Sequence, residues 1–401
     1  MDTALNDLIA ARVDALEPEL IALRRDLHAH PEIGYQEHRT TEVVRERLEA
    51  SDIRTRRLDG TGLVAELGAE QPTIRIGLRA DLDALPVQEQ TGLPFASLEP
   101  GMCHACGHDV HTAGVLGATL ALAAVEQQLL EAGIAVRAIF QPAEEVLPGG
   151  AESIVAQGEL VDVDRIFAVH CDPSIDVGTV GLAAGPITAA CDDVTVTVTG
   201  RGGHTSRPHL TGDLTYALAK VITDVPAVLS RRLDPRAGAA LVWGAVHAGS
   251  APNVIPSSGT ARGTLRMLDA QTWLRAEGLV EQIVHEVVAP YRVHAEVHHE
   301  RGVPPVVNDD ACIDALRRSA ATLIGTDAPV GTPQSLGGED FSWMLQRTPG
   351  ALARLGTRTP GGATYELHQG NLVVDERAVA IAAKVLAGAV LCSGGIGFGR
   401  V

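Results

Sequence analysis

The chain has 401 residues, of which 45% are hydrophobic and 20% are charged, a balance that excludes fibrous and intrinsically disordered proteins. It carries 32 basic and 50 acidic residues, a formal net charge of −18, and its only lysines are Lys220 and Lys384. Such a charge repels nucleic acid and anionic membranes, so we expect neither as a partner. The length favours two domains over one.

The start of the chain and its cysteines favour a cytoplasmic protein. Residues 1–20 mix acidic and apolar side chains at helical spacing and lack the features of a secretory signal. The apolar stretch 378–392 is interrupted by Lys384 and is shorter than the ~18–20 residues of a membrane span, so we interpret it as a buried closing helix. The six cysteines show no disulfide-framework spacing, which predicts free thiols in a reducing compartment.

The first half of the chain shows strand and helix patterns in alternation. Helical periodicity predicts helices over 5–28, over 37–50, and from after His111 to Gly133, the last one of about twenty residues. Alternating or β-branched runs predict strands over 62–67, 73–79, 135–140 and 164–170, the last ending at His170. Strands separated by helices of this length predict βαβ units and a mainly parallel sheet covered on both faces.

The pattern changes at Gly185 and Pro186. Segment 192–200 alternates strictly with period two, as a half-exposed antiparallel strand does. It is followed by predicted helices at 213–231 and 270–289 and by predicted strands at 241–249, 259–268 and 293–302. We therefore predict an α/β protein in which a discontinuous catalytic domain, residues 1–186 and 303–401, is interrupted by a smaller α+β lid domain, residues 187–302.

The densest group of metal-binding side chains is HACGHDVH, residues 104–111, directly before a predicted helix. In an extended segment Cys106 and His108 project to the same side, so a thiolate and an imidazole can reach one site. Three histidines, a cysteine and an aspartate in so short a stretch favour a metal site over a purely structural role.

Further side chains of this kind follow separate predicted strands. Glu144 and Glu145 follow one buried strand, His170 ends another, and Asp81 and Asp83 follow a third. Ligands of open α/β sheets bind beyond the carboxyl ends of the strands, so these side chains are expected to share a site. The adjacent glutamates suggest that one ligates metal while the other moves a proton to and from a metal-activated water.

Eight blocks together resemble the co-catalytic metallo-aminoacylase and carboxypeptidase family. In order they are RADLDALP (79–86), HACGHDVHTA (104–113), QPAEE (141–145), GGHTSRPH (202–209), NVIP (253–256), GTLR (263–266), GGEDF (337–341) and LHQGN (367–371). They are similar to the branch of hippurate hydrolases, bacterial N-acyl-amino-acid amidohydrolases and plant indole-acetyl-amino-acid hydrolases, and particularly to its actinobacterial amidohydrolases. The match spans most of the chain.

The resemblance implies a site for two divalent ions, Mn²⁺ or Zn²⁺ with Co²⁺ as an alternative. The implied ligands are Cys106, His108, Glu145, His170 and His368. Glu144 matches the general base of the family, and Asp83 matches an acidic residue behind the site that orients a ligand.

In the predicted lid the resemblance implies three substrate-facing residues. His204 matches a histidine that stabilises the oxyanion, and Asn253 and Arg266 match residues that hold the scissile carbonyl and the substrate carboxylate. The resemblance also implies a homodimer formed through the lid, and whether His204 serves its own active site or that of a partner stays open. Glu339 and Asp340 match the border of the active site, without an assigned role.

The predicted function is hydrolysis of the amide bond of an N-acyl amino acid or a related small amide, with Glu144 as the base. A dipeptidase or carboxypeptidase of the same family is one alternative. A catalytically inactive metal-dependent binding module is the other, although such a module does not need Glu144. Structural and functional roles both stay open for Asp81, His104, His111 and His209. The other histidines are predicted not to be catalytic, and His298 and His299 are predicted to be solvated and not to bind a ligand.

Overall fold

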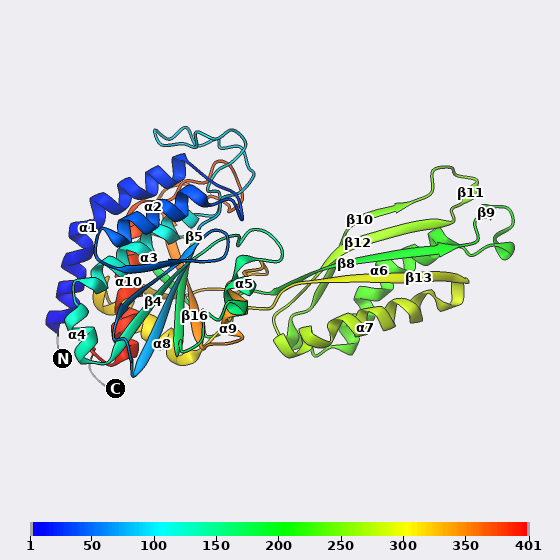
Figure 1. The fold of residues 1–401 in the computed structure, drawn as a ribbon. Coiled ribbons are helices and arrows are strands. Elements are labelled where there is room, and N and C mark those ends of the chain that lie inside the picture. The colour runs from blue at the N-terminus through cyan, green and yellow to red at the C-terminus, as the bar shows by residue number, and fades with distance from the viewer. Residues whose placement is uncertain (1–2, 399–401) are drawn as a thin grey trace. The chain divides into compact units, whose positions relative to one another are not determined.

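The computed structural model describes residues 3–398, and its internal contacts divide the chain into two compact units (Figure 1). The first unit contains Met1–Gly185, Val307–Pro333 and Trp343–Val401, and the second contains Pro186–Val306 and Gln334–Ser342. This grouping differs from the predicted domains mainly in segment 334–342, which we had assigned to the catalytic domain. That segment contacts the start of the second unit, where Ser335 N donates to Ile187 O at 2.8 Å.

Eight strands form one sheet in the first unit, in the order β1-β2-β4-β3-β5-β16-β6-β15. Their bounds are β1 Arg54–Arg57, β2 Leu63–Gly68, β3 Ile74–Asp81, β4 Ile134–Gln141, β5 Arg165–Asp176, β6 Val180–Leu182, β15 Pro329–Gly331 and β16 Gly350–Arg358. The central strands β4, β3, β5 and β16 are mutually parallel, so the prediction of a mainly parallel sheet is confirmed. Their carboxyl ends lie at one edge of the sheet.

Four helices of the first unit pack against one another and share one buried apolar cluster with the sheet. They are α1 Thr3–Ala29, α3 His108–Ala123, α8 Asp310–Leu323 and α10 Arg377–Gly394. Among the described residues only α10 is long and apolar enough to cross a membrane, and 67% of that stretch is buried inside the protein. The predicted closing helix therefore lies in the core.

Two predicted elements of the first unit have other boundaries. The single helix expected to end at Gly133 is divided into α3 and α4 Glu126–Glu131, because Val125 has φ −120° and ψ 24°, outside the helical region. This break lets α4 pack on β2 and β4. Strand β5 does not end at His170 but continues to Asp176, paired with β16. Three shorter helices are α2 His38–Glu49, α5 Gly150–Ala156 and α9 Phe341–Leu345.

The second unit contains a four-stranded antiparallel sheet in the order β10-β12-β8-β13, against which two helices pack. The elements are β8 Ala190–Gly200, α6 Leu214–Arg232, β10 Ala240–Ala248, β12 Ser258–Met267, α7 Ala270–Val288 and β13 Val293–Val303. The predicted alternation along β8 is confirmed, since Val194, Val196 and Val198 are buried and Thr195 and Thr197 are partly exposed.

Short elements complete the second unit and its connections. Two-stranded ribbons pair β9 Gly203–His204 with β11 Val254–Ile255, and β7 Gly185–Pro186 with β14 Val307–Asn308. The 3-10 turns are Pro208–Leu210, Pro235–Ala237 and Ala289–Tyr291. Helices α6, α7 and α8 each begin after an aspartate whose side chain accepts an amide N–H of the first turn, which explains where they start.

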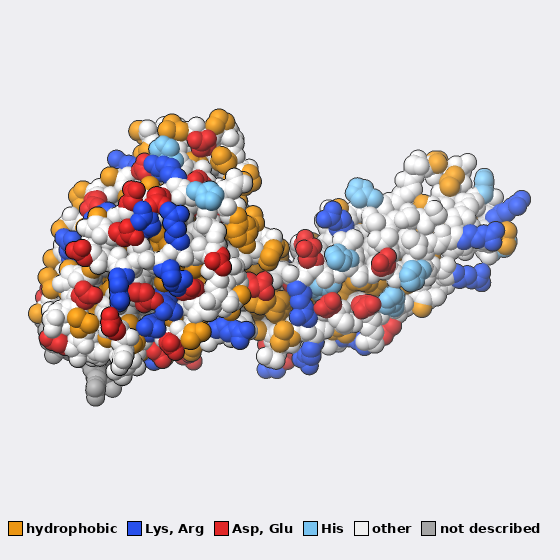
Figure 2. Space-filling view, in the orientation of Figure 1, with side chains coloured by type: hydrophobic (Ala, Val, Ile, Leu, Met, Phe, Trp, Pro, Cys, Tyr) orange, Lys and Arg blue, Asp and Glu red, His pale blue; other side chains and the backbone are white. Residues whose placement is uncertain are grey.

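The histidines of the second unit are mostly at its surface. Figure 2 shows several histidine side chains there, and His247, His285, His294 and His298 are exposed. The prediction that His299 is solvated is wrong. Its side chain is 2% exposed and its Nε2 lies 2.7 Å from Asp192 Oδ2, because Asp192 is buried between β8, β13 and Trp273 of α7 and needs hydrogen-bond donors.

Candidate active site

Cys106 and His108 enter the site through a sharp turn and not through the extended segment that we expected. Gly107, with φ 86°, precedes α3, and His108 is the first residue of that helix. A Cβ at Gly107 would lie 2.7 Å from Cys171 Sγ, so both the backbone conformation and the close packing require glycine here. Cys106, His108 and His170 nevertheless offer ligand atoms that lie within 4.8 Å of one another.

Glu144 and Glu145 are carried by a left-handed turn that follows β4. Ala143 has φ 55°, and its N–H donates to the buried Glu37 Oε1 at 2.7 Å. The N–H of Glu145 donates to Asp83 Oδ2 at 2.9 Å. Two carboxylates from other parts of the chain therefore hold alternate amides of this turn and fix the direction of both glutamates.

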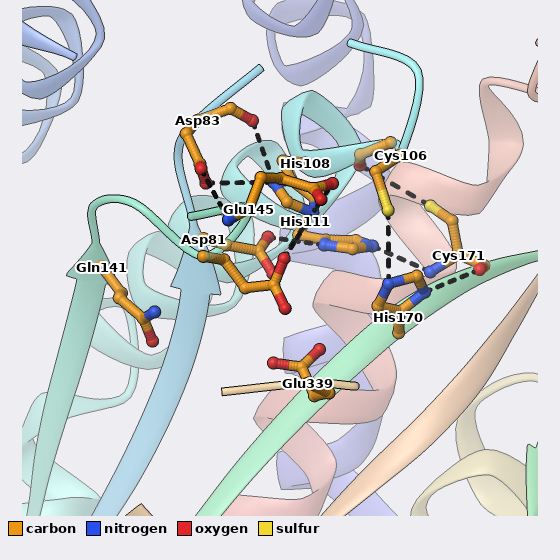
Figure 3. A network of polar contacts seen from close by, with 12 residues as sticks. Asp81, Asp83, Cys106, His108, His111, Gln141, Glu145, His170, Cys171 and Glu339 are labelled. Carbon is orange, nitrogen blue, oxygen red and sulfur yellow. Dashed lines mark hydrogen bonds and ion pairs between the residues drawn. The ribbon is translucent and has the colours of Figure 1, made fainter. Parts of the chain in front are cut away.

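All five predicted metal ligands converge in the first unit, where Figure 3 shows four of them. Cys106 Sγ lies 3.5 Å from His170 Nε2. His108 Nε2 and His368 Nε2 lie 3.7 Å and 3.4 Å from Glu145 Oε1. Four of these side chains are at most 10% exposed, whereas the side chain of His368 is 56% exposed.

Backbone hydrogen bonds fix the tautomers of two of these histidines. His108 Nδ1 donates to Asp83 O at 2.9 Å, and His170 Nδ1 donates to Cys171 O at 2.9 Å. Each ring therefore carries a proton on Nδ1 and turns its Nε2 toward the cluster. His108 Nε2 is buried without a hydrogen-bond partner among the described residues. An orphaned imidazole nitrogen beside a thiol and a carboxylate fits a divalent cation.

His111, whose role the sequence leaves open, uses both ring nitrogens in hydrogen bonds. Its Nδ1 donates to Asp81 Oδ1 at 2.6 Å, and its Nε2 accepts the N–H of Cys171 at 2.8 Å. Asp81 also accepts from Arg79 Nη1 at 2.7 Å, and Arg79 Nε donates to Gln141 Oε1 at 2.8 Å. This chain of bonds links the ends of β4 and β3 through α3 to β5, and Figure 3 shows the part from Asp81 through His111 to Cys171.

Burial opposes the charged form of His108, but Asp81 and Cys106 outweigh it and raise the pKa of His108 well above its usual range. For Cys106 and His170, burial is the largest effect. Burial raises the pKa of the Cys106 thiol well above its usual range. It lowers the pKa of His170 well below its usual range, and the charges of His111 and Arg354 act in the same direction. His170 is therefore neutral and ready to bind a cation, whereas Cys106 must release a proton to do so.

A second buried network lies directly behind His108. Asp109 Oδ2 is 2.6 Å from Arg24 Nε and 2.9 Å from His28 Nδ1, and His28 Nε2 is 3.3 Å from Glu89 Oε1. Burial opposes the charged form of His28, but Asp109 and Glu89 outweigh it and raise the pKa of His28 to about 8. The network anchors α1 and the loop before His108 to the start of α3.

Four residues with open roles have different surroundings. His104 is 3% exposed, and burial lowers its pKa to about 4, so it is neutral. Glu339 and Asp340 are buried in segment 334–342 of the second unit. His209 is exposed in the turn Pro208–Leu210.

The three predicted lid residues do not lie together. His204 and Asn253 are exposed neighbours, because His204 pairs with Val254 and Thr205 N donates to Asn253 O at 3.1 Å. Arg266 lies opposite Cys191 at the other end of β8 and β12. Its Nη1 donates to Leu336 O.

The sequence analysis missed several charged residues that the structure adds to this region, among them Glu37 and Arg354. Glu37 has no local signal, because its partner Ala143 lies far along the chain. Arg354 has one: it is the only charged residue in the apolar run 351–356.

The comparison with protein families decides the identity of the chain. Residues 77–391 match the sequence model of peptidase family M20/M25/M40. The chain belongs to this family. A longer Rhodococcus jostii protein with a provisional glutamate–cysteine ligase name is 48% identical over 364 residues, which are 90% of this chain and 45% of that protein. The chain therefore spans less than half the length of that relative.

Other members of the M20/M25/M40 family match over most of their length. N-acetyl-L-cysteine deacetylase of Bacillus subtilis is 35% identical over 94% of this chain and 90% of that protein. The YxeP protein of Bacillus subtilis is described as a dinuclear metal-binding peptidase, and its structure is 33% identical in sequence with a TM-score of 0.82. The match covers 95% of this chain and 99% of the YxeP chain. This M20/M25/M40 protein is a metal-dependent amidohydrolase.

Proposed function

We propose that this enzyme hydrolyses the amide bond of N-acyl amino acids, with Glu144 as the general base. The observation that carries the proposal is the convergence of five metal-binding side chains with Glu144 where β3, β4 and β5 end or pass. The name of the Bacillus subtilis deacetylase, which is 35% identical, supports an acyl amino acid as the substrate. The hippurate-hydrolase branch, and within it the similarity to actinobacterial amidohydrolases, rests on the sequence blocks alone.

The proposed metal centre holds two divalent ions in the ligand set Cys106, His108, Glu145, His170 and His368. Bound cations supply a low-pKa water and polarise the scissile carbonyl. The thiol favours Zn²⁺, whereas imidazole and carboxylate ligands also accept Mn²⁺ or Co²⁺. Asp83 supports this assignment as an orienting residue, because its carbonyl holds His108 Nδ1 and its carboxylate holds the amide of Glu145.

The proposed chemistry of the protein itself is a proton transfer by Glu144. Its Oε2 lies 3.9 Å from His108 Nε2, beside the ligand Glu145, so its carboxylate is within reach of an attacking water. It takes a proton from that water and then delivers it to the leaving amine. Glu145 next to it stays a ligand, so two adjacent carboxylates have different roles.

The proposed lid residues are His204 for the oxyanion, Asn253 for the scissile carbonyl and Arg266 for the substrate carboxylate. We propose a homodimer through the lid, since the edge strand β10 exposes Val242 and Val246, which are 62% and 45% exposed. Mixing His204→Ala with Glu144→Gln protein tests whether His204 acts across the dimer: restored activity shows action in trans, and its absence shows action in cis. All six cysteines are free, which supports a cytoplasmic location.

The test is a substrate panel of N-acetyl and N-benzoyl amino acids and dipeptides, assayed with Mn²⁺, Zn²⁺ or Co²⁺. Hydrolysis of the acyl amino acids supports the proposal, and cleavage restricted to dipeptides favours a peptidase. The peptidase alternative has support from thermostable carboxypeptidase 1 of Saccharolobus solfataricus, which is 34% identical. The match covers 91% of this chain and 92% of that protein. Absence of turnover on every substrate favours the inactive binding module.

The base is tested by a matched pair of glutamate variants. Glu144→Gln is expected to abolish turnover and keep the bound metal, whereas Glu145→Gln is expected to lose metal as well. Metal content is measured by mass spectrometry on both proteins. Substantial activity in Glu144→Gln contradicts the assignment of the base.

A further inference from the structure

Three arginines are buried among the described residues, and one of them differs from the others. Arg24 pairs with Asp109 at 2.6 Å, and Arg79 pairs with Asp81 at 2.7 Å. Arg354 is 8% exposed, yet its side chain forms no hydrogen bond or ion pair with any residue from 3 to 398. None of its nitrogens is among the buried unpaired atoms, so solvent reaches the guanidinium of this otherwise buried residue, which has no protein counter-ion.

The position of Arg354 is set by the register of the central strands. Arg354 on β16 lies beside His170 on the parallel strand β5, about 4.8 Å away across the ladder. The residues that flank each of them, Ala353 on β16 and Val169 on β5 among them, belong to the helix-covered core. Since side chains alternate along a strand, Arg354 and His170 point to the other face together.

The neighbour of Arg354 on the other side of the ladder packs closely against it. This neighbour is Gly181 of β6, where a Cβ would lie 3.1 Å from Arg354 Cβ and 2.8 Å from Thr332 Cβ. The charge of Arg354 also contributes, after burial and His111, to lowering the pKa of His170. Arg354 therefore lies next to the proposed metal centre.

An unpaired guanidinium that is open to solvent on an otherwise buried side chain is suited to bind an anion. A lysine or histidine in this position can lose its proton and become neutral, but arginine stays charged at every physiological pH. Such a charge is less well solvated than one on the open surface, which favours an anionic partner. Divalent ions at the neighbouring ligands add positive charge, which increases the need for an anion that the protein does not supply.

We propose that Arg354 binds a carboxylate of the substrate, through the two parallel hydrogen bonds that a guanidinium offers to a carboxylate. The proposal rests on the proposed function, because every N-acyl amino acid carries a carboxylate beside the scissile amide. Arg354 is then a specificity-determining residue of the first unit, distinct from Arg266 of the lid. The carboxylate is either a second one on an acidic side chain, which leaves the α-carboxylate to Arg266, or the α-carboxylate, which Arg354 then holds in place of Arg266.

Stability distinguishes this role from a structural one. A structural arginine stabilises the fold, so its replacement lowers the melting temperature. If Arg354 awaits an anion, Arg354→Leu removes an unpaired charge on an otherwise buried side chain, and the melting temperature of the ligand-free protein stays the same or rises. A clear fall in the melting temperature overturns the proposal.

Binding is measured by calorimetry on metal-loaded Glu144→Gln protein, which is expected to bind substrates without hydrolysing them. The ligands are N-acetylleucine with one carboxylate, N-acetylglutamate with two, and N-acetylleucinamide with none. Arg354→Leu in this background is expected to weaken the carboxylate ligands by roughly 10- to 100-fold and leave the amide unchanged. If Arg354→Leu weakens the binding of both N-acetylleucine and N-acetylglutamate, Arg354 binds the α-carboxylate. If it weakens the binding of N-acetylglutamate alone, Arg354 binds the second carboxylate.

Two controls complete the experiment. Arg358→Leu removes an arginine from the same strand that is already paired with Asp176 at 2.6 Å, and it is expected to leave binding unchanged. Arg354→Lys keeps the charge without the planar fork and is expected to bind with intermediate affinity. Equal binding of all three ligands by the parent and Arg354→Leu proteins overturns the Arg354 proposal alone. A parent protein that binds none of them overturns the proposed function and, with it, the role of Arg354.

Discussion

The carboxylate of Glu37 accepts a hydrogen bond of 2.7 Å from the amide of Ala143, the residue before Glu144. Glu37 is completely buried and also accepts from Tyr35 N at 3.0 Å and from Thr61 Oγ1 at 2.6 Å. The positive φ of Ala143 costs a residue with a side chain about 1–2 kcal/mol. Glu37 therefore stabilises the strained turn that gives Glu144 its direction.

Replacement of Glu37 by alanine is expected to lower kcat by roughly 100-fold, since a small displacement of a catalytic group has effects of this size. Glu37→Gln is expected to recover most of the rate, because its amide oxygen still accepts from Ala143 and its NH₂ group can donate to Thr61. The control is Thr61→Val, which removes one bond to Glu37 and leaves the bond to Ala143. A loss of kcat in Thr61→Val as large as that in Glu37→Ala contradicts the positioning role.

Asp81→Asn is expected to lower the free energy of unfolding by about 3–5 kcal/mol, as the breaking of buried ion pairs does. Asp81 accepts from His111 on one oxygen and from Arg79 on the other. Asparagine has only one oxygen, so its NH₂ group must face a donor. Chemical denaturation measures the change, and Asp309→Asn, which keeps a helix cap, is the control. A loss below about 1 kcal/mol for Asp81→Asn contradicts the proposed tautomer of His111.

The contribution of His28 to stability is expected to depend on pH. Its pKa rises from 6.5 to about 8 on folding, so its protonated form is favoured in the folded state. This contribution is complete below pH 6.5, is lost as the pH rises through 8, and amounts to about 2 kcal/mol. The difference in unfolding free energy between the wild type and His28→Gln is therefore expected to shrink over this range. The exposed His294 provides the control His294→Gln, and a difference that stays constant or grows with pH refutes the prediction.

Gly107→Ala is expected to be more destabilising than Gly60→Ala. Both glycines have a similar positive φ, 86° and 92°, so alanine has a similar backbone strain of about 1–2 kcal/mol at either position. A Cβ at Gly60 meets nothing within 4 Å, whereas one at Gly107 lies 2.7 Å from Cys171 Sγ. Thermal unfolding and metal affinity measure the difference. Equal losses in the two variants refute the packing argument.

The predictable part of the site is the part that follows from strand ends. Glu145 and His170 are placed by buried apolar runs that the sequence shows directly, and parallel strands bring such positions together. The sequence predicts an extended segment before His108, whereas the structure has a turn at Gly107. Glycine is itself a signal for such a left-handed conformation. The break at Val125 has no such signal, because neither glycine nor proline occurs there and tertiary packing decides it.

The unpredictable part consists of long-range hydrogen bonds. Glu37 and Ala143 are 106 positions apart, and His28 and Asp109 are 81 apart. Nothing in local periodicity relates such residues, since their pairing depends on how α1 and α2 pack beside the sheet. Periodicity therefore predicts which elements carry the ligands, while the residues that orient those ligands become visible only in three dimensions.

The insertion of the second unit between β6 and β15 has a consequence for the order of folding. Strand β16 pairs with β5, yet the ribosome completes Pro186–Val306 between them. The second unit has its own antiparallel sheet and apolar core, so it is expected to fold before the sheet of the first unit is closed. His368 follows β16, so the proposed ligand set becomes complete only late in biosynthesis.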